Sequence, residues 1–532
     1  MKNINLYILP FSIRSVWISK DQPFQNIYNI NDINGLRKYI GWWIINGWRE
    51  YPGVSLTSSF DLINSLEAVG PGLRDTFSHN GIIAQCILFE WEFLSSQFIK
   101  NEYMDLEFKS WWDENHLKYF PLLELYYEGW IQEEAKLNHL TRPIQDIYAK
   151  EKKTGVNLIG MGDGILGIGE DARTVTKAID QCGIDVGLFP YPQVTSKDLL
   201  DLRLKNFFIK KLKFNINIFT IPIFETQRAF VELGKNILLG YYNIGYWQWE
   251  LPFFPENYKI VTNYFDEIWS SSKFTYHALK SLCNKNIYHM PLPVEIDVVP
   301  VGDRISFGLD DGIFYFLSVI DGNSWLTRKN PEGVINSFQA AFPISKKHPV
   351  GLIFKVINVT RNPAWSKLIT IISKDPRIKI IDSPLARAKL FGLISSVDAL
   401  ISLHRSEGFG RVPAEAMLLQ KPVIVTAYSG NMDYCNIDNS FLVDYDLIPL
   451  SKGDYNLWEG QTWAQPKLDS AVEMLRTCFD NSSLRDFLAK NGQIFIQNNY
   501  SISQVAKIYK KNLEKIALQQ NLWGTPGGSG RG

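Results

Sequence analysis

The amino-acid sequence predicts an α/β protein with two tandem, doubly wound parallel sheets and an additional, mainly helical region at the N-terminus. Short apolar runs that alternate with helical segments are typical of buried parallel strands joined by helices. One series of such runs occupies 155–160, 185–190, 215–224, 236–244 and 267–272. A second series occupies 313–320, 350–358, 377–382, 398–403 and 422–430. The segment 290–302 between them is rich in proline and glycine, so we expect a hinge there and a ligand cleft between the carboxyl ends of the two sheets.

The first part of the chain differs from the rest because its apolar residues recur at helical spacing, as in 36–52 and 108–140. A chain of 532 residues is also too long for one hydrophobic core. Helices are expected near the C-terminus at 467–479, 482–493 and 502–518. The predicted division is a helical accessory domain at 1–150, the first sheet at 151–298, the second at 299–500, a C-terminal helix at 501–523 and a flexible tail at 524–532.

Composition and charge argue against a nucleic-acid-binding or a secreted protein. Lysine plus arginine and aspartate plus glutamate both number 55, so no net charge attracts nucleic acid, and we expect no nucleic-acid partner. Five dispersed cysteines predict reduced thiols, and the N-terminus lacks the apolar stretch of a secretory signal. We therefore expect a cytoplasmic protein. Its 16 tryptophans suit either carbohydrate-stacking surfaces or several large cores, and composition leaves both open.

Two glutamates flank the start of a predicted helix in the segment SLHRSEGFGRVPAEAM, residues 402–417. Pro413 suits the first helical position, which would place Glu415 in the first turn. The glycines on both sides of Phe409 let backbone approach a ligand closely, and a helix N-terminus attracts anions. Ionised carboxylates such as Glu407 accept hydrogen bonds from hydroxyls. Phosphate on the amides and diols on the carboxylates describe a nucleotide sugar, whereas the simpler alternative is a capping glutamate without a ligand.

The segment 406–434 resembles the E-x7-E signature of retaining, nucleotide-sugar-dependent glycosyltransferases of family 4, of the bacterial polysaccharide-biosynthesis type. The resemblance extends over roughly 155–520, about two thirds of the chain, and implies the GT-B fold with its two Rossmann-like domains. It implies that Glu407 faces the donor sugar and that Glu415 binds the nucleotide ribose. The amides of Gly408, Phe409 and Gly410 are then expected near the sugar and the diphosphate.

A lysine precedes a second predicted helix in the segment 324–338. Asn330 as N-cap and Pro331 at the first helical position place Lys329 where a positive charge opposes the helix dipole. A bound diphosphate would remove this conflict, and the resemblance implies a phosphate-binding lysine here. The arginine that relatives carry five or six residues earlier is absent. Arg328 is the candidate to replace it, and the alternative is a solvated surface charge.

The loop after the first strand, at 160–175, superficially resembles a dinucleotide-binding fingerprint, but the expected downstream acidic residue is not evident. In the glycosyltransferases that the sequence resembles, this loop faces the cleft. Gly167 and Gly169 are therefore candidates for backbone approach to the donor phosphate or the acceptor. The alternative is a tight strand-to-helix turn without a ligand.

The segment 243–256 follows the fourth strand, where many relatives carry a cleft histidine that this sequence lacks. Trp247, Trp249 and Glu250 stand there instead, so an aromatic floor with one carboxylate is expected, with Glu250 as a second catalytic candidate beside Glu407. Buried core aromatics are the alternative. Ser272, before the hinge, is a weaker cleft candidate.

The sequence contains no histidine cluster spaced for a metal, so we expect no metal and no cofactor besides the nucleotide sugar as co-substrate. The leaving diphosphate would be stabilised by Lys329, backbone amides and helix dipoles. The resemblance implies attack from the face on which the diphosphate leaves, without a protein nucleophile. His404 is either a cleft residue or, more commonly for a strand end, a packed side chain.

These expectations combine into a retaining, metal-independent hexosyltransferase. It would move a mannose- or glucose-type hexose from a nucleotide diphosphate sugar to a carbohydrate or lipid-linked glycan. Two alternatives remain, a non-catalytic nucleotide-sugar-binding subunit of a glycan-assembly complex and a sugar-nucleotide epimerase of the same fold. The helical region around Trp42, Trp43 and Trp48 is expected to hold an acceptor, a partner enzyme or the inner face of the membrane, or simply to form a core.

Overall fold

The computed structural model describes residues 148–520 except for gaps at 166, 192–199, 255–257, 322–323, 358–362, 456 and much of 224–239. Before residue 148 it describes residues 22–30, 32–47 and a few isolated positions, so the tail expected at 524–532 lies outside the described residues. The chain divides into two compact units. One unit comprises residues 1–149 and 223–241, and the other comprises 150–222 and 242–532. The domain boundaries expected from the sequence stay predictions.

In the first unit the described secondary structure is helical: α2 (Gln22–Ile27), α3 (Ile33–Trp42) and the π-helical turn η2 (Trp43–Gly47). The ring of Tyr39 stacks on that of Trp42 with centroids 5.6 Å apart, and the Tyr39 hydroxyl donates to the Ile13 carbonyl at 2.6 Å. Trp42 and Trp43 are both buried, so these two side chains belong to a core. Trp48 and most of the predicted helical domain lie outside the described residues.

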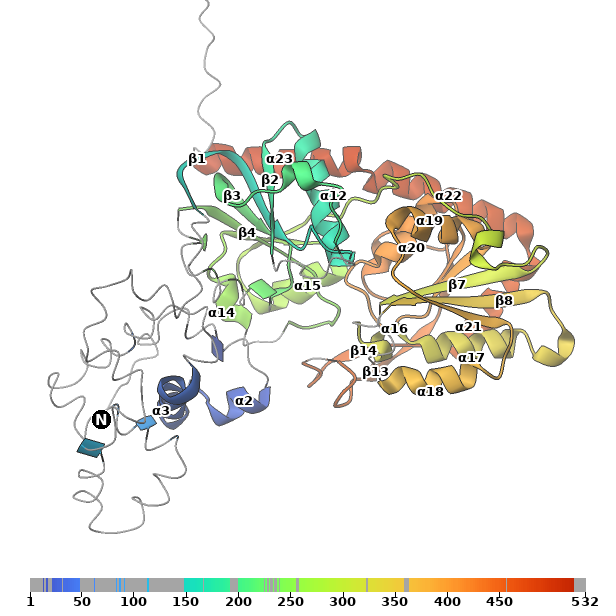
Figure 1. Ribbon diagram of the computed structural model, residues 1–532, viewed down its shortest axis with the longest axis horizontal. Coiled ribbons are helices and arrows are strands. Elements are labelled where there is room, and N and C mark those ends of the chain that lie inside the picture. The colour runs from blue at the N-terminus through green and yellow to red at the C-terminus, as the bar shows by residue number, and fades with distance from the viewer. Residues whose placement is uncertain are drawn as a thin grey trace, which may run out of the picture. The chain divides into compact units, whose positions relative to one another are not determined.

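The second unit begins with a six-stranded parallel sheet (Figure 1). Its strands are β1 (Tyr148–Gly160), β2 (Val186–Pro190), β3 (Leu212–Phe219), β4 (Tyr242–Trp247), β5 (Glu267–Ser270) and β6 (Asn286–His289), in the order β2-β1-β3-β4-β5-β6. The accompanying helices are α12 (Gly167–Gln181), α14 (Lys259–Thr262) and α15 (Lys273–Leu282).

Two details of this sheet differ from the expectation. The strand predicted at 236–244 is instead β4, which begins at Tyr242, because Gly240 adopts a left-handed turn conformation with φ 73°. The strand β6 was not predicted, because its residues are only partly buried and form no apolar run.

A second six-stranded parallel sheet follows in the same unit (Figure 1). Its strands are β7 (Phe314–Asp321), β8 (Val350–Ile357), β9 (Ile378–Asp382), β10 (Ala399–Ser402), β11 (Val423–Thr426) and β12 (Phe441–Val443), in the order β12-β11-β10-β7-β8-β9. Strand β8 is buried along nearly its whole length, as its mostly apolar sequence predicts. The helices between these strands are α16 (Leu326–Lys329), α17 (Pro331–Ala341), α18 (Pro363–Ile372), α19 (Arg387–Ser396) and α20 (Arg411–Leu418).

An antiparallel hairpin follows this sheet, formed by β13 (Tyr445–Pro449) and β14 (Thr462–Pro466). Neither strand was predicted, because both are short and only β14 carries buried residues next to each other. Short 3-10 turns also occur at Lys205–Phe207, Ile305–Phe307, Ile344–Lys346 and Gly430–Asp433.

Three helices complete the described chain: α21 (Leu468–Asp480), α22 (Ser482–Tyr500) and α23 (Ile502–Gln520). Helix α22 packs against α20, whereas α23 returns to the first sheet and packs against α12. The Tyr509 hydroxyl donates to the Pro291 carbonyl at 2.9 Å, and the Cys182 thiol donates to the Ala506 carbonyl at 3.0 Å. The last helix is therefore part of the core of the first sheet, and the three predicted C-terminal helices are confirmed as helices.

All five cysteines are free thiols. Among the helices that the structure describes, none combines the length and the apolar character needed to cross a membrane.

Candidate functional site

A cluster of two cations and one carboxylate lies beyond the carboxyl ends of β7 and β10, two neighbouring strands of the second sheet. The Lys329 ammonium donates to Glu407 Oε1 at 2.5 Å. The Arg328 guanidinium lies 3.1 Å from Glu407 Oε2 and donates to the Ser406 carbonyl at 2.9 Å. The structure thus brings together three of the predicted donor-binding residues, from segments far apart in the sequence.

Local sequence explains how Lys329 is held at this place. Asn330 caps α17 with φ 51°, its side chain accepts from the Gly333 amide at 3.1 Å, and Pro331 is the first helical residue. The Asn330 side chain also donates to the Leu403 carbonyl at 2.9 Å, just beyond β10. The predicted cap and helix start are confirmed, and the same asparagine ties the lysine-bearing turn to the segment that leads to Glu407.

The charge state of Glu407 follows from its surroundings. Its side chain is buried, and its backbone amide donates to the Ser429 hydroxyl at 2.8 Å. Burial raises the pKa of the Glu407 carboxyl, but the charges of Lys329 and Arg328 outweigh burial and hold the pKa at about 2. At neutral pH this group is therefore an anion that only accepts hydrogen bonds.

Arg328 is also buried, with 6% of its surface exposed, which excludes the alternative of a solvated surface charge. Burial lowers the pKa of its guanidinium, but Glu407 and Glu250 together raise the pKa above its ordinary value. Its Nε–H has no hydrogen-bond acceptor among the described residues. A buried donor without an acceptor is costly, so this guanidinium can bind an additional anion.

The glycines next to Glu407 shape the start of α20. Gly410 is the N-cap with φ 85°, and a Cβ there would lie 2.8 Å from the Tyr434 hydroxyl oxygen, so the position requires glycine. A Cβ on Gly408 would lie 3.3 Å from the Trp249 carbonyl oxygen. Phe409 between them is buried, and its ring contacts Tyr434 with centroids 5.3 Å apart. The Phe409 side chain is thus a core group, and only its backbone remains as a candidate ligand contact.

The predicted start of this helix was wrong. Helix α20 begins at Arg411, so Pro413 is its third residue and Glu415 its fifth, outside the first turn. The left-handed conformation of Gly410 starts the helix two residues before the proline. Glu415 is therefore not a capping group, which removes the simplest explanation for its charge.

Glu415 belongs to a different ion pair from Glu407. Its Oε1 accepts from the Arg387 guanidinium at 2.7 Å, and only 1% of the residue is exposed. Its Oε2 has no hydrogen-bond donor among the described residues. Glu415 thus keeps one buried acceptor atom available for a ligand hydroxyl.

Arg387 continues into a buried network centred on Glu170 in the first turn of α12. The Glu170 carboxylate lies 2.7 Å from Arg173, 2.6 Å from Arg203 and 3.4 Å from Arg387. The ion pair between Glu170 and Arg387 connects α12 of the first sheet with α19 of the second. Sequence reasoning missed it, because acidic residues in a first helical turn are expected for the helix dipole in any case.

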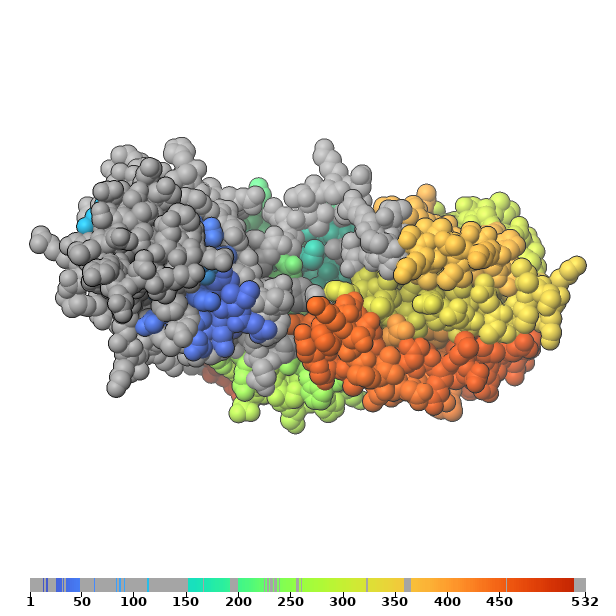
Figure 2. All heavy atoms as spheres, turned by 90° about the horizontal axis from the view of Figure 1, so that it is seen from below, coloured from blue at the N-terminus to red at the C-terminus, as the bar shows by residue number. Residues whose placement is uncertain are grey.

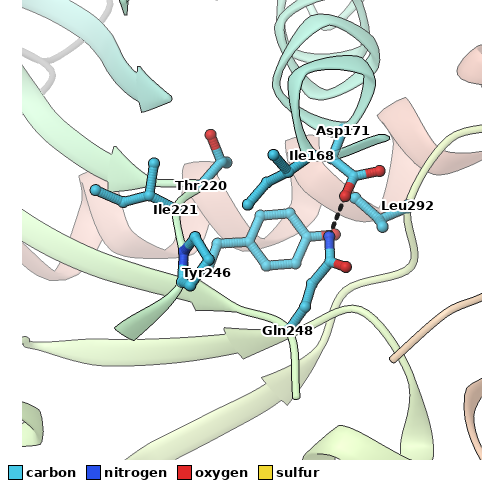
Figure 3. A pocket seen from close by; sticks show the side chains of 8 residues that line it. Ile168, Asp171, Thr220, Ile221, Tyr246, Gln248 and Leu292 are labelled. Atoms are coloured by element: carbon cyan, nitrogen blue, oxygen red, sulfur yellow. Dashed lines mark hydrogen bonds between the residues drawn. The ribbon is translucent and has the colours of Figure 1, made fainter. Parts of the chain in front are cut away.

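A small pocket lies at the carboxyl ends of β3 and β4 in the first sheet, as Figure 3 shows. Asp171 and Gln248 are joined there by a hydrogen bond, and the other Asp171 oxygen accepts from Arg411 Nε at 2.7 Å. The lining residues are Ile168, Asp171, Thr220, Ile221, Pro222, Tyr246, Gln248 and Leu292. The pocket is therefore apolar with one polar corner.

The two candidate glycines of the loop after β1 differ in their surroundings. A Cβ on Gly169 would lie 2.4 Å from the Gly164 carbonyl oxygen and 2.7 Å from that of Met161. A Cβ on Gly167 would have no atom within 4 Å. Close backbone packing thus explains Gly169, and Gly167 keeps open space for the predicted approach of a ligand.

The aromatic candidates of the first sheet are core residues. Trp247 is fully buried with its ring 4.9 Å from that of Phe265, and Trp249 is stacked on Phe254 at 4.6 Å. Neither ring lies on an open surface, so the structure shows no aromatic floor at these two positions. Ser272 is buried as the N-cap of α15, where its hydroxyl accepts from the Thr275 amide at 3.2 Å.

Glu250, in contrast, lies close to the cation cluster. Its Oε2 accepts from the Tyr455 hydroxyl at 2.7 Å, and its Oε1 lies 3.8 Å from Arg328. Tyr455 comes from the loop of the β13–β14 hairpin and was not among the predicted residues. Nothing local marks it, because it is one of 24 tyrosines and its partner lies 205 positions away.

His404 and the other side chains that could bind a metal were compared with the geometry of a metal site. His404 is fully buried, with one ring nitrogen 3.0 Å from the Ser402 hydroxyl and the other 3.0 Å from the Asn431 side-chain oxygen. Burial lowers the pKa of His404, so it is a neutral, packed strand-end side chain. Within the described part of the chain, no group of three or more His, Cys, Asp and Glu side chains is placed to hold a metal ion.

Comparison with solved structures identifies the architecture. HepE from Anabaena, solved in complex with UDP and glucose, superposes with a TM-score of 0.52 at 13% identity, covering 68% of this chain and 100% of that chain. Sucrose-phosphate synthase from Thermosynechococcus elongatus gives a TM-score of 0.52 at 13% identity, covering 69% and 100%. The chain has the GT-B fold. No curated protein sequence matches it.

Residues 384–445 of this GT-B protein match the family of group 1 glycosyl transferases. The matched segment includes Arg387, Glu407 and Glu415, and it ends where the β13–β14 hairpin begins. Together, the fold and the matched segment support a glycosyltransferase of the GT-B type.

Proposed function

We propose that the protein is a retaining glycosyltransferase that transfers a mannose- or glucose-type hexose from a nucleotide diphosphate sugar to a carbohydrate or lipid-linked glycan. The observation that carries the proposal is the pairing of Arg328 and Lys329 with the Glu407 carboxylate beyond the carboxyl ends of the second sheet. The crevice at the carboxyl ends of strands is where open α/β sheets bind their ligands. The group 1 match at residues 384–445 supports the same reaction class.

In this proposal the two cations exchange partners when the donor binds. The diphosphate takes Lys329 and Arg328, whose charges stabilise it as the leaving group. Glu407, released from its ion pairs, accepts a hydrogen bond from a donor-sugar hydroxyl. Glu415 Oε2, buried and without a donor among the described residues, accepts from a ribose hydroxyl. The acceptor then attacks from the face on which the diphosphate leaves, and no metal and no protein nucleophile take part.

The reaction itself is the first test. The pure chain is incubated with UDP-glucose and GDP-mannose in the presence of EDTA, and the sugar released or transferred is followed by NMR. We expect turnover of one donor with the anomeric configuration retained, because charged side chains perform the role that a metal would otherwise fill. An inverted anomer would contradict retention, and loss of turnover on chelation with recovery in magnesium or manganese would contradict metal independence. Binding without turnover would indicate a non-catalytic subunit, and an epimerised nucleotide sugar would indicate an epimerase.

Replacing Lys329 with alanine should weaken the binding of the nucleoside diphosphate by about 1.5–3 kcal/mol, the contribution of one charge-assisted contact. Isothermal titration with UDP and GDP measures the effect. Lys467 is half exposed and forms an ion pair with the exposed Asp446, so it is the matched control, and Lys467→Ala should bind as the wild type does. Unchanged affinity of Lys329→Ala would remove the lysine from the donor site.

A further inference from the structure

Hydrogen bonds hold the loop of the β13–β14 hairpin to two segments near the cation cluster, one at Thr327 and one at Phe253. The Thr327 hydroxyl, next to Arg328, donates to the Asp454 carbonyl in the loop at 2.6 Å. The Gln461 side chain at the other end of the loop exchanges two hydrogen bonds with the backbone of Phe253, at 2.8 and 3.2 Å. Figure 1 shows the hairpin beside α16, and Figure 2 shows the orange residues of this region at the surface. The loop is therefore held in place from two sides.

This loop places the Tyr455 side chain at the cluster. Its ring contacts that of Trp325 with centroids 5.7 Å apart, and its hydroxyl donates to Glu250 Oε2 at 2.7 Å. Burial and the charge of Glu250 raise the pKa of the Tyr455 hydroxyl well above its ordinary value. The hydroxyl thus keeps its proton and is a permanent donor to the Glu250 carboxylate.

Arg328 lies between two carboxylates that compete for it. Glu407 Oε2 is 3.1 Å from the guanidinium, and Glu250 Oε1 is 3.8 Å from it, which is beyond hydrogen-bond distance. A carboxylate that loses a hydrogen-bond donor is stabilised by approach to the nearest cation, here Arg328. Such an approach would place a second anion on the guanidinium that the diphosphate needs.

We propose that Tyr455 is a positioning residue for the donor site: its hydroxyl holds the Glu250 carboxylate away from Arg328 and so leaves the guanidinium for the diphosphate of the donor. The inference rests on the proposed function, because it assumes that a nucleoside diphosphate binds at Arg328 and Lys329. It adds a residue outside the segment that matches the glycosyl transferase family, and it gives the hairpin a role in donor affinity.

The test is a double-mutant cycle read by isothermal titration with UDP and GDP on the full-length chain. Tyr455→Phe removes only the hydroxyl and should weaken binding by about tenfold, since the freed Glu250 carboxylate then competes for Arg328. On a Glu250→Gln background the same substitution should change the affinity by less than about twofold, because no competing charge remains. A merely structural role of Tyr455 would weaken binding equally on both backgrounds, and that result would overturn the inference.

Two further variants keep the result interpretable. Tyr445→Phe removes a hydroxyl from the same hairpin that has no hydrogen bond among the described residues, and it should bind as the wild type does. Glu250→Gln alone should bind the nucleotide at least as tightly as the wild type, so weaker binding contradicts the inference even if Tyr455→Phe does not fold. Absence of binding by the wild type itself would reject the proposed function, whereas wild-type binding that Tyr455→Phe leaves unchanged would reject this inference alone.

Discussion

Replacing Glu407 with glutamine should reduce sugar transfer on the order of a hundredfold or more, while nucleoside diphosphate binding is retained. The neutral amide oxygen accepts a hydrogen bond from the donor-sugar hydroxyl more weakly than a carboxylate does, and the amide cannot balance the charges of Lys329 and Arg328. The diphosphate still finds both cations, no longer occupied by an internal carboxylate. A transfer assay and isothermal titration on the same sample measure the two effects. Glu459→Gln, a change of an exposed carboxylate, should leave both unaffected. Turnover close to the wild-type rate would remove Glu407 from the reaction.

The same variant should lose stability without ligand, because the buried Arg328 and the partly exposed Lys329 lose their shared counter-charge. Bound UDP should therefore raise its melting temperature more than that of the wild type. The pKa of Glu407 is lowered from its ordinary value of 4.5 to about 2. Its contribution to stability is thus complete above pH 4.5 and is lost as the pH falls toward 2. The difference in stability between wild type and variant should shrink over that range.

Replacing Glu170 with alanine should lower the free energy of unfolding by about 3–5 kcal/mol, the cost of removing one partner from a buried ion network. The residue is 2% exposed, and its removal leaves Arg173, Arg203 and Arg387 without this shared carboxylate. Burial raises the pKa of the Glu170 carboxyl, but these arginines and Arg411 outweigh burial and lower the pKa far below its ordinary value. Urea unfolding monitored by fluorescence measures the effect.

The exposed pair Asp446–Lys467 provides the matched control for this prediction. Its two side chains are 68% and 49% exposed, so Asp446→Asn should change the free energy of unfolding by less than about 1 kcal/mol. Similar losses in the two variants would mean that the network around Glu170 contributes no more than a surface ion pair.

The sheets show where a sequence is informative. Strand β8 was predictable because seven of its eight residues are buried, and strands that are buried on both faces are mostly apolar. Strand β6 and the β13–β14 hairpin were missed, because partly exposed strands tolerate polar residues and leave no apolar run. The predicted start of α20 was also wrong. Proline favours the first position of a helix, which led to the choice of Pro413, whereas the positive φ of Gly410, which starts the helix at Arg411, cannot be predicted from the sequence.

In the candidate site, too, local features could be predicted and contacts between distant segments could not. Local features could be predicted from the sequence: the Asn330 cap, the first helical Pro331, and the placement of Lys329 just before that helix. Which charged side chains pair with one another depends on the packing of the whole chain. Glu407 pairs with a lysine 78 positions away, Glu415 with Arg387 rather than with the cations beside Glu407, and Glu250 with a tyrosine from the hairpin. Caps and turns arise from neighbours within a few residues and leave a local pattern, whereas an ion pair between distant segments depends on how the whole chain packs.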